Sequence, residues 1–439
     1  MSSFKSLILK SIVLPIADIV MKTKISFYYN EIKRLQKFSK SGIQQWQTKK
    51  LNTLIAHSYL HCDYYFDLFN SLNLKPEDIN SISDLKKLPI LTKKVMRDNY
   101  IKLISRKSKS IPSKIASTGG SSGDPAVFIK DNNSWSFSVA HSIINWERTG
   151  YRYGDKYIAL GSTSLFVNKK MSLEHKIYYW LKGKFGLNGV NMSDDVCKYY
   201  VELISRKRIR FIYGYASSLY LLAKYVVKNN LSLNIGACYS TSEILTDVYR
   251  VTISLAFKCK ILDCYGAGDG AISAFEHQQG FYEVGYNSIF WQQSSDENFI
   301  GPILVTDLFN YSMPLINYQL GDEIQVIPDN NTHFYNGQII NKVLGRISDV
   351  IELENGSVIT GPGFTILFKD LPVEYYNIAK TGVNLITCTI KKLPEYSIEH
   401  ERIIIDTFKK QVGSESAIDI VYTTNVIYSK SGKRQYFSH

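Results

Sequence analysis

Between residues 156 and 264 the hydrophobic pattern alternates between short continuous apolar runs and helical spacing. Short apolar runs are typical of buried strands, whereas apolar residues repeated every three or four positions are typical of amphipathic helices. The runs predict strands at 157–160, 211–213, 237–240 and 260–264, with helices at 194–204, 218–227 and 246–257. Strands that alternate with helices at this spacing form a parallel sheet covered by helices, so we expect an α/β core.

The hydrophobic pattern is different on either side of this core. Before it, apolar residues at helical spacing predict amphipathic helices at 43–60 and 135–146. After residue 280, the pattern changes to short β runs such as 303–306 and 324–327, which predict a β-rich subdomain. The remaining elements are strands expected at 349–353, 385–390 and 418–422 and a helix at 398–411.

We interpret these C-terminal elements as a small α+β domain. The predicted organisation is a large N-terminal domain at 1–345 and a small, mobile C-terminal domain at 346–439, with a hinge at Gly345-Arg346.

Apart from the net charge, the composition says little about the function of the chain. The 439 residues are 45% hydrophobic and 21% charged, which is typical of globular proteins, and the formal net charge is +13. A basic chain can bind nucleic acid, but the densest run, Arg206 to Arg210, leads into an apolar strand and has no aromatic stacking platform. Specific nucleic-acid binding is therefore not expected, and attraction to ATP or to an anionic membrane surface explains the charge as well.

An apolar stretch, Leu7 to Met21, is interrupted by Lys10, Pro15 and Asp18. It is too short and too broken to span a membrane, and it lacks the small-residue cleavage site of a signal peptide. We therefore expect a cytoplasmic protein. A peripheral, amphipathic contact of this segment with a membrane stays open.

The stretch that carries most chemical information runs from Ser117 to Pro125 and reads STGGSSGDP. Glycines and small hydroxylated residues make a loop whose N–H and O–H groups can surround a polyphosphate. The loop is not a Walker A motif, because no Gly-Lys-Ser/Thr follows it. By itself, such a stretch is more often an ordinary surface loop than a phosphate-binding loop.

Further motifs follow this loop in a fixed order. They are Tyr213 to Ala223 (YGYASSLYLLA), Ser240 to Leu245 (STSEIL), Tyr265 to Asp269 (YGAGD), Thr306-Asp307, Tyr318 to Asp322 (YQLGD), Gly345 to Asp349 (GRISD) and Ser431 to Arg434 (SGKR). The ordered set resembles the adenylate-forming superfamily of acyl-CoA synthetases and adenylation domains. Within it, the chain is most similar to the branch of phenylacetate–CoA ligases and the CapK-type proteins of capsule biosynthesis.

The resemblance implies an α/β fold and an AMP-forming ligase that uses ATP and Mg²⁺ to convert a carboxylic acid to an acyl-adenylate. It also implies roles for single residues. Asp269 would hold the metal, Asp322 the ribose hydroxyls, and Lys433 would reach the α-phosphate. The other nucleotide-binding residues would be Ser117, Thr118, Gly119, Ser121, Ser122 and Gly123 at the phosphates, Tyr265 and Gly266 at the adenine, and Arg346 beside the nucleotide.

The acid and its acceptor are less constrained. An acyl pocket lined by Tyr213, Tyr215, Ser217, Tyr239 and Glu243 is expected, and the acceptor is either CoA or an amine or hydroxyl on a sugar intermediate. The capsule-type resemblance favours capsule, O-antigen or exopolysaccharide biosynthesis. The alternative is a catalytically degenerate, membrane-peripheral assembly partner of such a pathway.

Three positions depart from the family pattern. Asp124 stands where many relatives carry Lys, Asp269 where they carry Glu, and Ser348 where they carry a hinge Asp. A shorter carboxylate at 269 would contact the metal through water. A zinc site is not expected, since the six cysteines form no CxxC pair.

Overall fold

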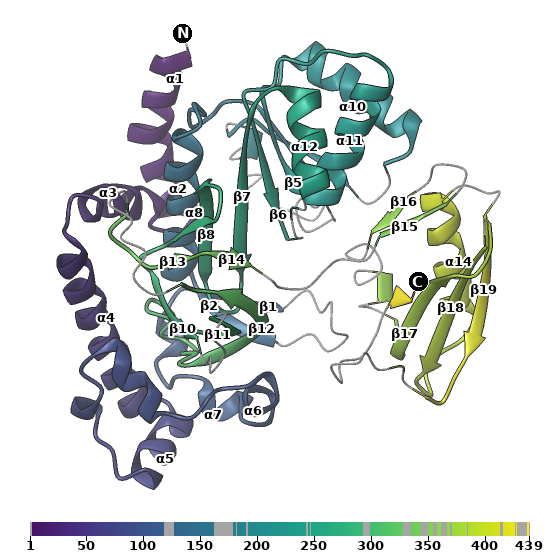
Figure 1. The fold of residues 1–439 in the computed structure, drawn as a ribbon. Helices are drawn as coiled ribbons and strands as arrows, with labels where there is room; N and C mark the ends of the chain where they lie inside the picture. The colour runs from purple at the N-terminus through teal and green to yellow at the C-terminus, as the bar shows by residue number, and fades with distance from the viewer. Residues whose placement is uncertain are drawn as a thin grey trace. The chain divides into compact units, whose positions relative to one another are not determined.

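Two units make up the chain, and each is assembled from segments that are distant in the sequence. The first comprises Met1–Thr118, Ala126–Asp155 and Leu262–Gly345; the second comprises Gly119–Pro125, Lys156–Ile261 and Arg346–His439. The structure is a computed structural model (Figure 1). It describes the chain except residues 1, 118–126, 162–178, 181, 190–191, 243–244, 246, 293–298, 328–334, 344–349, 354–357, 361–366, 369–370, 384, 413–415, 426, 428–436 and 439.

The first unit begins with a continuous helix. α1 (Ser2–Ile8), a π-helical turn (Leu9–Val13) and α2 (Leu14–Met21) follow one another directly. Pro15 is the second residue of α2 and directly follows the π-helical turn. Asp18 is buried and accepts a hydrogen bond of 2.9 Å from the backbone N–H of Ile25, at the start of α3 (Ile25–Leu35). Both residues therefore interrupt the apolar run but leave the helix intact.

More helices of the first unit follow along the chain. Those predicted at 43–60 and 135–146 are confirmed as α4 (Lys40–His61) and α8 (Asn132–Glu147). Ser39 caps α4 by accepting a hydrogen bond of 3.2 Å from the N–H of Gly42. Between α4 and α8 lie α5 (Asp63–Ser71), α6 (Lys93–Asp98), α7 (Tyr100–Leu103) and the 3₁₀ turns Pro76–Asp78, Ile82–Lys87 and Ser108–Ser110.

The strands of the first unit are antiparallel. β1 (Ser113–Ser117) pairs with β2 (Val127–Asp131), so the two strands flank the glycine-rich loop. A four-stranded sheet has the order β10 (Ser288–Gln292), β11 (Ile300–Asp307), β12 (Tyr318–Gln325) and β14 (Lys342–Val343). A second group has the order β13 (Ile339–Ile340), β9 (Phe281–Val284), β8 (Ile272–Gln278) and β7 (Lys260–Ala267). These strands are the β-rich part predicted after residue 280, although the run at 324–327 is only the end of the longer β12.

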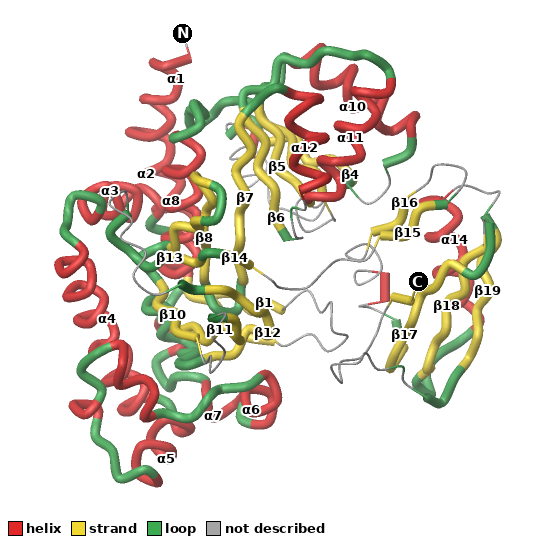
Figure 2. The backbone as a smooth tube through the Cα atoms, viewed as in Figure 1, coloured by secondary structure: helices red, strands yellow, loops and turns green. Residues whose placement is uncertain are grey.

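The second unit contains the predicted α/β alternation. Parallel strands stand in the order β4 (Lys184–Asn188), β3 (Tyr157–Gly161), β5 (Phe211–Tyr215) and β6 (Ala237–Thr241). The helices α10 (Asp194–Lys207), α11 (Ala216–Lys228) and α12 (Asp247–Phe257) alternate with these strands along the chain and pack on the sheet (Figure 2). Ile212 and Cys238 on the strands share one buried core with Leu222 and Ile253 on the helices. The parallel α/β core is therefore confirmed.

The same unit includes the C-terminal elements. β15 (Val350–Glu352) pairs with β16 (Val358–Thr360), and a four-stranded sheet has the order β19 (Ala417–Tyr422), β18 (Leu385–Lys392), β17 (Val373–Lys380) and β20 (Phe437–Ser438). α14 (Ile398–Val412) buries Ile404 and Phe408 in a core shared with Ile378 and Cys388. These are the α+β elements predicted for this part of the chain. Within the described residues, no helix is long and apolar enough to cross a membrane.

Candidate active site

Two acidic residues with predicted nucleotide roles lie against tyrosines in the first unit. Tyr265, on β7, donates a hydrogen bond of 2.9 Å from its hydroxyl to Oδ2 of Asp322, on β12. Tyr318, at the start of β12, donates a hydrogen bond of 3.0 Å to Oδ2 of Asp269, just after β7. The structure therefore brings together the residues that the sequence assigned to the adenine, the metal and the ribose.

Local structure explains this arrangement. The two hydrogen bonds direct Tyr318 and Asp322 toward β7 and the residues that follow it, and β12 is bulged between Gln319 and Glu323 where it pairs with β11. Tyr318 is completely buried and Asp269 is 8% exposed. The Tyr318–Asp269 pair is therefore held in place by the packing around it. Gly321, immediately before Asp322, has a φ of +86°, a conformation that glycine adopts without strain.

The donor set suits ATP with Mg²⁺. A carboxylate offers about four lone-pair sites, and each tyrosine hydroxyl occupies one, so Asp269 and Asp322 can each accept further contacts. Among the residues that the structure describes, no group of three or more His, Cys, Asp and Glu could hold a metal. A metal at Asp269 would therefore take most of its ligands from phosphates and water, which is the coordination that Mg²⁺ favours.

A second polar cluster, formed by Lys130, Ser134 and Asp307, is also part of the first unit. Ser134 donates a hydrogen bond of 2.6 Å to Oδ2 of Asp307, and the N–H of Phe309 donates one of 3.0 Å to Oδ1. Burial raises the pKa of Asp307 to about 6, against the opposing effects of Ser134 and Lys130.

Lys130 connects this cluster to Asp269. Its ammonium group donates a hydrogen bond of 3.1 Å to the carbonyl of Gly268, the residue before Asp269. Burial lowers the pKa of Lys130, and the carboxylates of Asp307 and Asp269 oppose that shift. Sequence reasoning missed this lysine. The signal that could have found it is its place on β2, the strand that leads away from the glycine-rich loop.

The predicted acyl-pocket tyrosines belong to the second unit. Tyr213 pairs with Tyr239 across β5 and β6, and Tyr215 follows two positions later on the same face. The alternate positions, such as Ile212 and Cys238, face the helices, so the tyrosines lie on the opposite face of the sheet. Tyr239 is completely buried and stacks on Phe211 with ring centroids 6.3 Å apart. Ser217 is buried in the first turn of α11.

Several predicted residues lie outside the part of the chain that the structure describes. Of the phosphate loop, only Ser117 is described, at the end of β1 opposite Val127. The others are Thr118, Gly119, Ser121, Ser122, Gly123, Glu243, Arg346 and Lys433. Their roles stay predictions.

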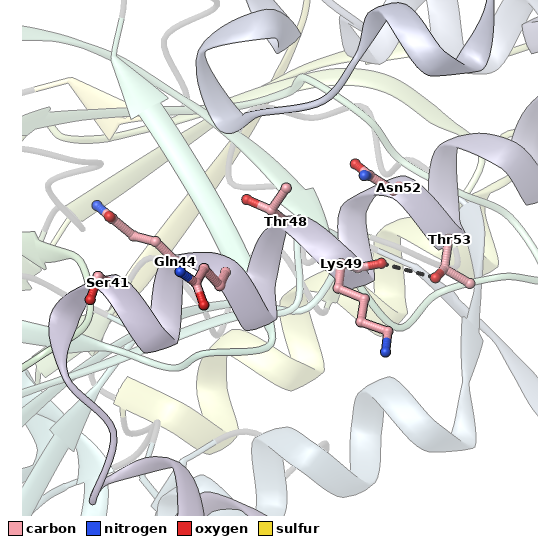
Figure 3. A pocket seen from close by; sticks show the side chains of 7 residues that line it. Ser41, Gln44, Thr48, Lys49, Asn52 and Thr53 are labelled. Atoms are coloured by element: carbon pink, nitrogen blue, oxygen red, sulfur yellow. Dashed lines mark hydrogen bonds between the residues drawn. The ribbon is translucent and has the colours of Figure 1, made fainter.

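A surface hollow lies along α4, and none of the predicted site residues that the structure describes lines it (Figure 3). Ser41, Gln44, Thr48 and Asn52 line it with hydroxyl and amide groups, beside Lys49. The figure also marks the hydrogen bond of 2.9 Å from the Thr53 hydroxyl to the Lys49 carbonyl. Since it contains no carboxylate and no pair of cations, we assign no chemistry to it.

Comparison with known proteins gives relatives over most of the chain. Protein CapK of Staphylococcus aureus is 23% identical over 340 residues, which is 76% of this chain and 74% of CapK. A phenylacetate–coenzyme A ligase of Aromatoleum evansii is 23% identical over 395 residues, or 85% of this chain and 81% of that ligase. No protein-family model matches.

Solved structures give the fold. An open conformation of 2-hydroxyisobutyryl-CoA ligase in complex with 2-HIB-AMP and CoA superimposes with a TM-score of 0.58 at 14% identity. The match covers 93% of this chain and 94% of that one. The predicted acyl-CoA ligase-like α/β fold, with a large N-terminal part and a smaller C-terminal part, is therefore confirmed.

Proposed function

Because this chain belongs to the adenylate-forming superfamily, in the branch of CapK and the phenylacetate–CoA ligases, we propose that it activates a carboxylic acid with ATP. The carboxylate displaces pyrophosphate from the α-phosphate, which gives an acyl-adenylate. A thiol, amine or hydroxyl group then attacks this mixed anhydride and releases AMP. The observation that carries the proposal is the pair of tyrosine–carboxylate hydrogen bonds, Tyr265 to Asp322 and Tyr318 to Asp269.

These bonds prepare the carboxylates for a nucleotide. Asp322 is held by one oxygen and would accept the ribose hydroxyls, for which a carboxylate has enough lone pairs. Asp269 would hold Mg²⁺, which offsets the negative charge of the phosphates when it is bound. Lys130 adds a fixed positive charge beside Asp269 and favours phosphate there. The tyrosines restrict the carboxylates before ATP arrives, so less side-chain entropy is lost on binding.

The remaining roles follow from the motifs. Ser117 and the loop that it starts would surround the β- and γ-phosphates, and Arg346 would lie beside the nucleotide. Lys433 would stabilise the negative charge that develops at the α-phosphate. Tyr213, Tyr215, Ser217, Tyr239 and Glu243 would line the acyl pocket. We further propose that residues 346–439 form a mobile lid domain that carries Lys433.

For the second step we propose CoA as the acceptor. The similarity to phenylacetate–coenzyme A ligases and to 2-hydroxyisobutyryl-CoA ligase favours a thioester product. The alternative acceptor is a sugar-linked amine or hydroxyl, because the resemblance to CapK-type proteins favours a role in capsule, O-antigen or exopolysaccharide biosynthesis.

Pyrophosphate release tests the first step. The enzyme is incubated with ATP, Mg²⁺, hydroxylamine as a trapping nucleophile, and one acid at a time from an aromatic, fatty, amino and sugar-acid panel. We expect one acid class to give release and a hydroxamate. Lys433→Ala should abolish both, whereas the control Lys409→Ala, on α14, should retain them. Absence of ATP binding would overturn the proposal; ATP binding without release from any acid would favour the degenerate assembly partner.

A further inference from the structure

The helix that runs from Ser2 to Met21 exposes a row of large apolar side chains. Its members are Phe4 (70% exposed), Ile8 (37%), Ile12 (54%), Ile16 (57%), Ile19 (80%) and Val20 (61%). Single exposed apolar residues are common on soluble domains, but a continuous row on one helix marks an interaction surface. We call this row the apolar stripe.

The π-helical turn keeps the apolar stripe straight. In a regular α-helix, residues four positions apart drift by about 40° around the axis, so positions 4, 8, 12, 16 and 20 would spiral around the helix. The turn at Leu9–Val13 contains i→i+5 hydrogen-bonded geometry, which absorbs about one extra residue. The positions after it are therefore rotated back toward those before it, and the apolar residues share one face.

Contacts on the other side of the helix fix this face outward. Lys10 forms an ion pair of 2.8 Å with Glu147 of α8, which also accepts a hydrogen bond of 2.6 Å from the hydroxyl of Tyr29. The amide of Asn132 donates a hydrogen bond of 2.8 Å to the carbonyl of Lys22. Because these partners belong to the body of the first unit, the helix cannot roll its apolar stripe inward.

The charges around the stripe have one sign. The first forty residues contain eight Lys and Arg but only two acidic residues, Asp18 and Glu31. Asp18 is buried, and Glu31 pairs with Arg34 at 2.6 Å. Lys5, Lys22 and Lys24 are exposed. The helix therefore presents an apolar face with basic flanks and no exposed carboxylate of its own.

We propose that this helix lies on a bilayer of anionic phospholipid, with the apolar stripe in the interface and the flanking lysines at the headgroups. A helix with this division of faces binds in the plane of the membrane, and anionic lipids attract its basic residues. The two faces thus match a lipid surface in both polarity and charge. A second copy of the chain would bring two sets of lysines together, which like-charge repulsion disfavours.

Vesicle flotation of the full chain tests this proposal. The vesicles contain phosphatidylcholine alone or with about 30% phosphatidylglycerol. We expect the wild type to float with the anionic vesicles and less with neutral ones. Ile16→Glu with Ile19→Glu should lower the bound fraction about tenfold, whereas the control Leu255→Glu, on an exposed position of α12, should not. Circular dichroism and the thermal midpoint verify folding; Ile16→Ser with Ile19→Ser replaces the glutamate pair if folding fails.

Three results would overturn the proposal. The wild type could fail to bind either vesicle, or the double variant could bind as well as the wild type, which would leave only non-specific charge attraction. In the third, sedimentation would find a wild-type dimer that the double variant converts to a monomer, without vesicle binding. That result would assign the apolar stripe to a second copy of the chain.

Discussion

Tyr265 and Asp322 are joined by a hydrogen bond of 2.9 Å between residues that belong to separate sequence motifs, YGAGD and YQLGD. Neither motif alone reveals that Tyr265 restrains Asp322. The phenol of Tyr265 orients the carboxylate of Asp322. Variants of the two residues can therefore distinguish the residue that contacts the ribose, Asp322, from the residue that positions it, Tyr265.

We expect Asp322→Ala to weaken ATP binding by at least about thirtyfold, because ribose hydrogen bonds to a charged group are lost. Tyr265→Phe should weaken it by about tenfold at most, since only one orienting hydrogen bond disappears. Calorimetric titration with ATP measures both. Asp98→Ala, which removes an exposed partner of Lys94, is the control. Equal ATP affinity in Asp322→Ala and wild type would rule out the ribose role.

Asp269→Asn should raise the Mg²⁺ concentration needed for half-maximal pyrophosphate release by about tenfold, because a neutral amide is a poorer ligand for a hard cation. Tyr318→Phe keeps the carboxylate and should cause a smaller increase. Chelation with EDTA should stop the reaction in every variant. The metal role of Asp269 is wrong if the Mg²⁺ curves of Asp269→Asn and wild type coincide.

Lys130→Gln should weaken binding of the ATP–Mg²⁺ complex by about tenfold, since a fixed cation beside Asp269 is removed. Lys114→Gln is a closely matched control, because Lys114 stands opposite Lys130 in the β1–β2 register. Measurement of ATP–Mg²⁺ binding at increasing salt concentration distinguishes the effects of the two variants. A screened, non-specific effect would appear in both variants and fade with ionic strength, and that outcome would contradict a specific role for Lys130.

His141 should make the fold sensitive to acid. Burial and, to a smaller extent, Arg148 lower the pKa of this imidazole to about 3, and its ordinary value is 6.5. A histidine with a depressed folded pKa stabilises the protein above its unfolded pKa, and this contribution is lost as the pH falls from 6.5 toward 3. The free energy of unfolding falls by at most about 5 kcal/mol through this group.

The variant His141→Gln removes the titration, so its free energy of unfolding should fall less steeply between pH 6.5 and 4 than that of the wild type. Urea unfolding at several pH values measures the slope. His400→Gln, on α14, is the control. Parallel curves for wild type and His141→Gln would contradict this assignment.

Asp18→Ala should destabilise the first unit by about 2–4 kcal/mol. The carboxylate accepts hydrogen bonds from the Thr23 hydroxyl at 2.7 Å, from the N–H of Ile25 at 2.9 Å, and from the N–H and hydroxyl of Ser26 at 2.7 and 2.6 Å. It thereby satisfies two N–H groups that the first turn of α3 leaves without helical partners. Denaturant unfolding should give a smaller loss for Asp18→Asn; a loss below about 0.5 kcal/mol in Asp18→Ala would exclude the capping role.

Periodicity was sufficient to predict the α/β core, because strands such as 211–213 and helices such as 218–227 are defined by local spacing of apolar residues. It could not predict Lys130, whose importance depends on a carbonyl 138 positions away. Nor could it predict the continuous helix at Ser2–Met21. Pro15 and Asp18 normally argue against a helix interior, and only the position of Pro15 directly after the π-helical turn and the contacts of Asp18 with α3 make them compatible.

The π-helical turn at Leu9–Val13 also decides where this chain can change in length. Loss of one residue there, for example Ser11, would relax the turn to an ordinary α-helix and leave the flanking segments aligned. Loss of one residue from α2, for example Ala17, would instead rotate the helix before it by about 100° relative to Asp18 and α3, which lie together after the deletion. Two deletions six positions apart would thus have opposite consequences, and only the first would be tolerated during divergence.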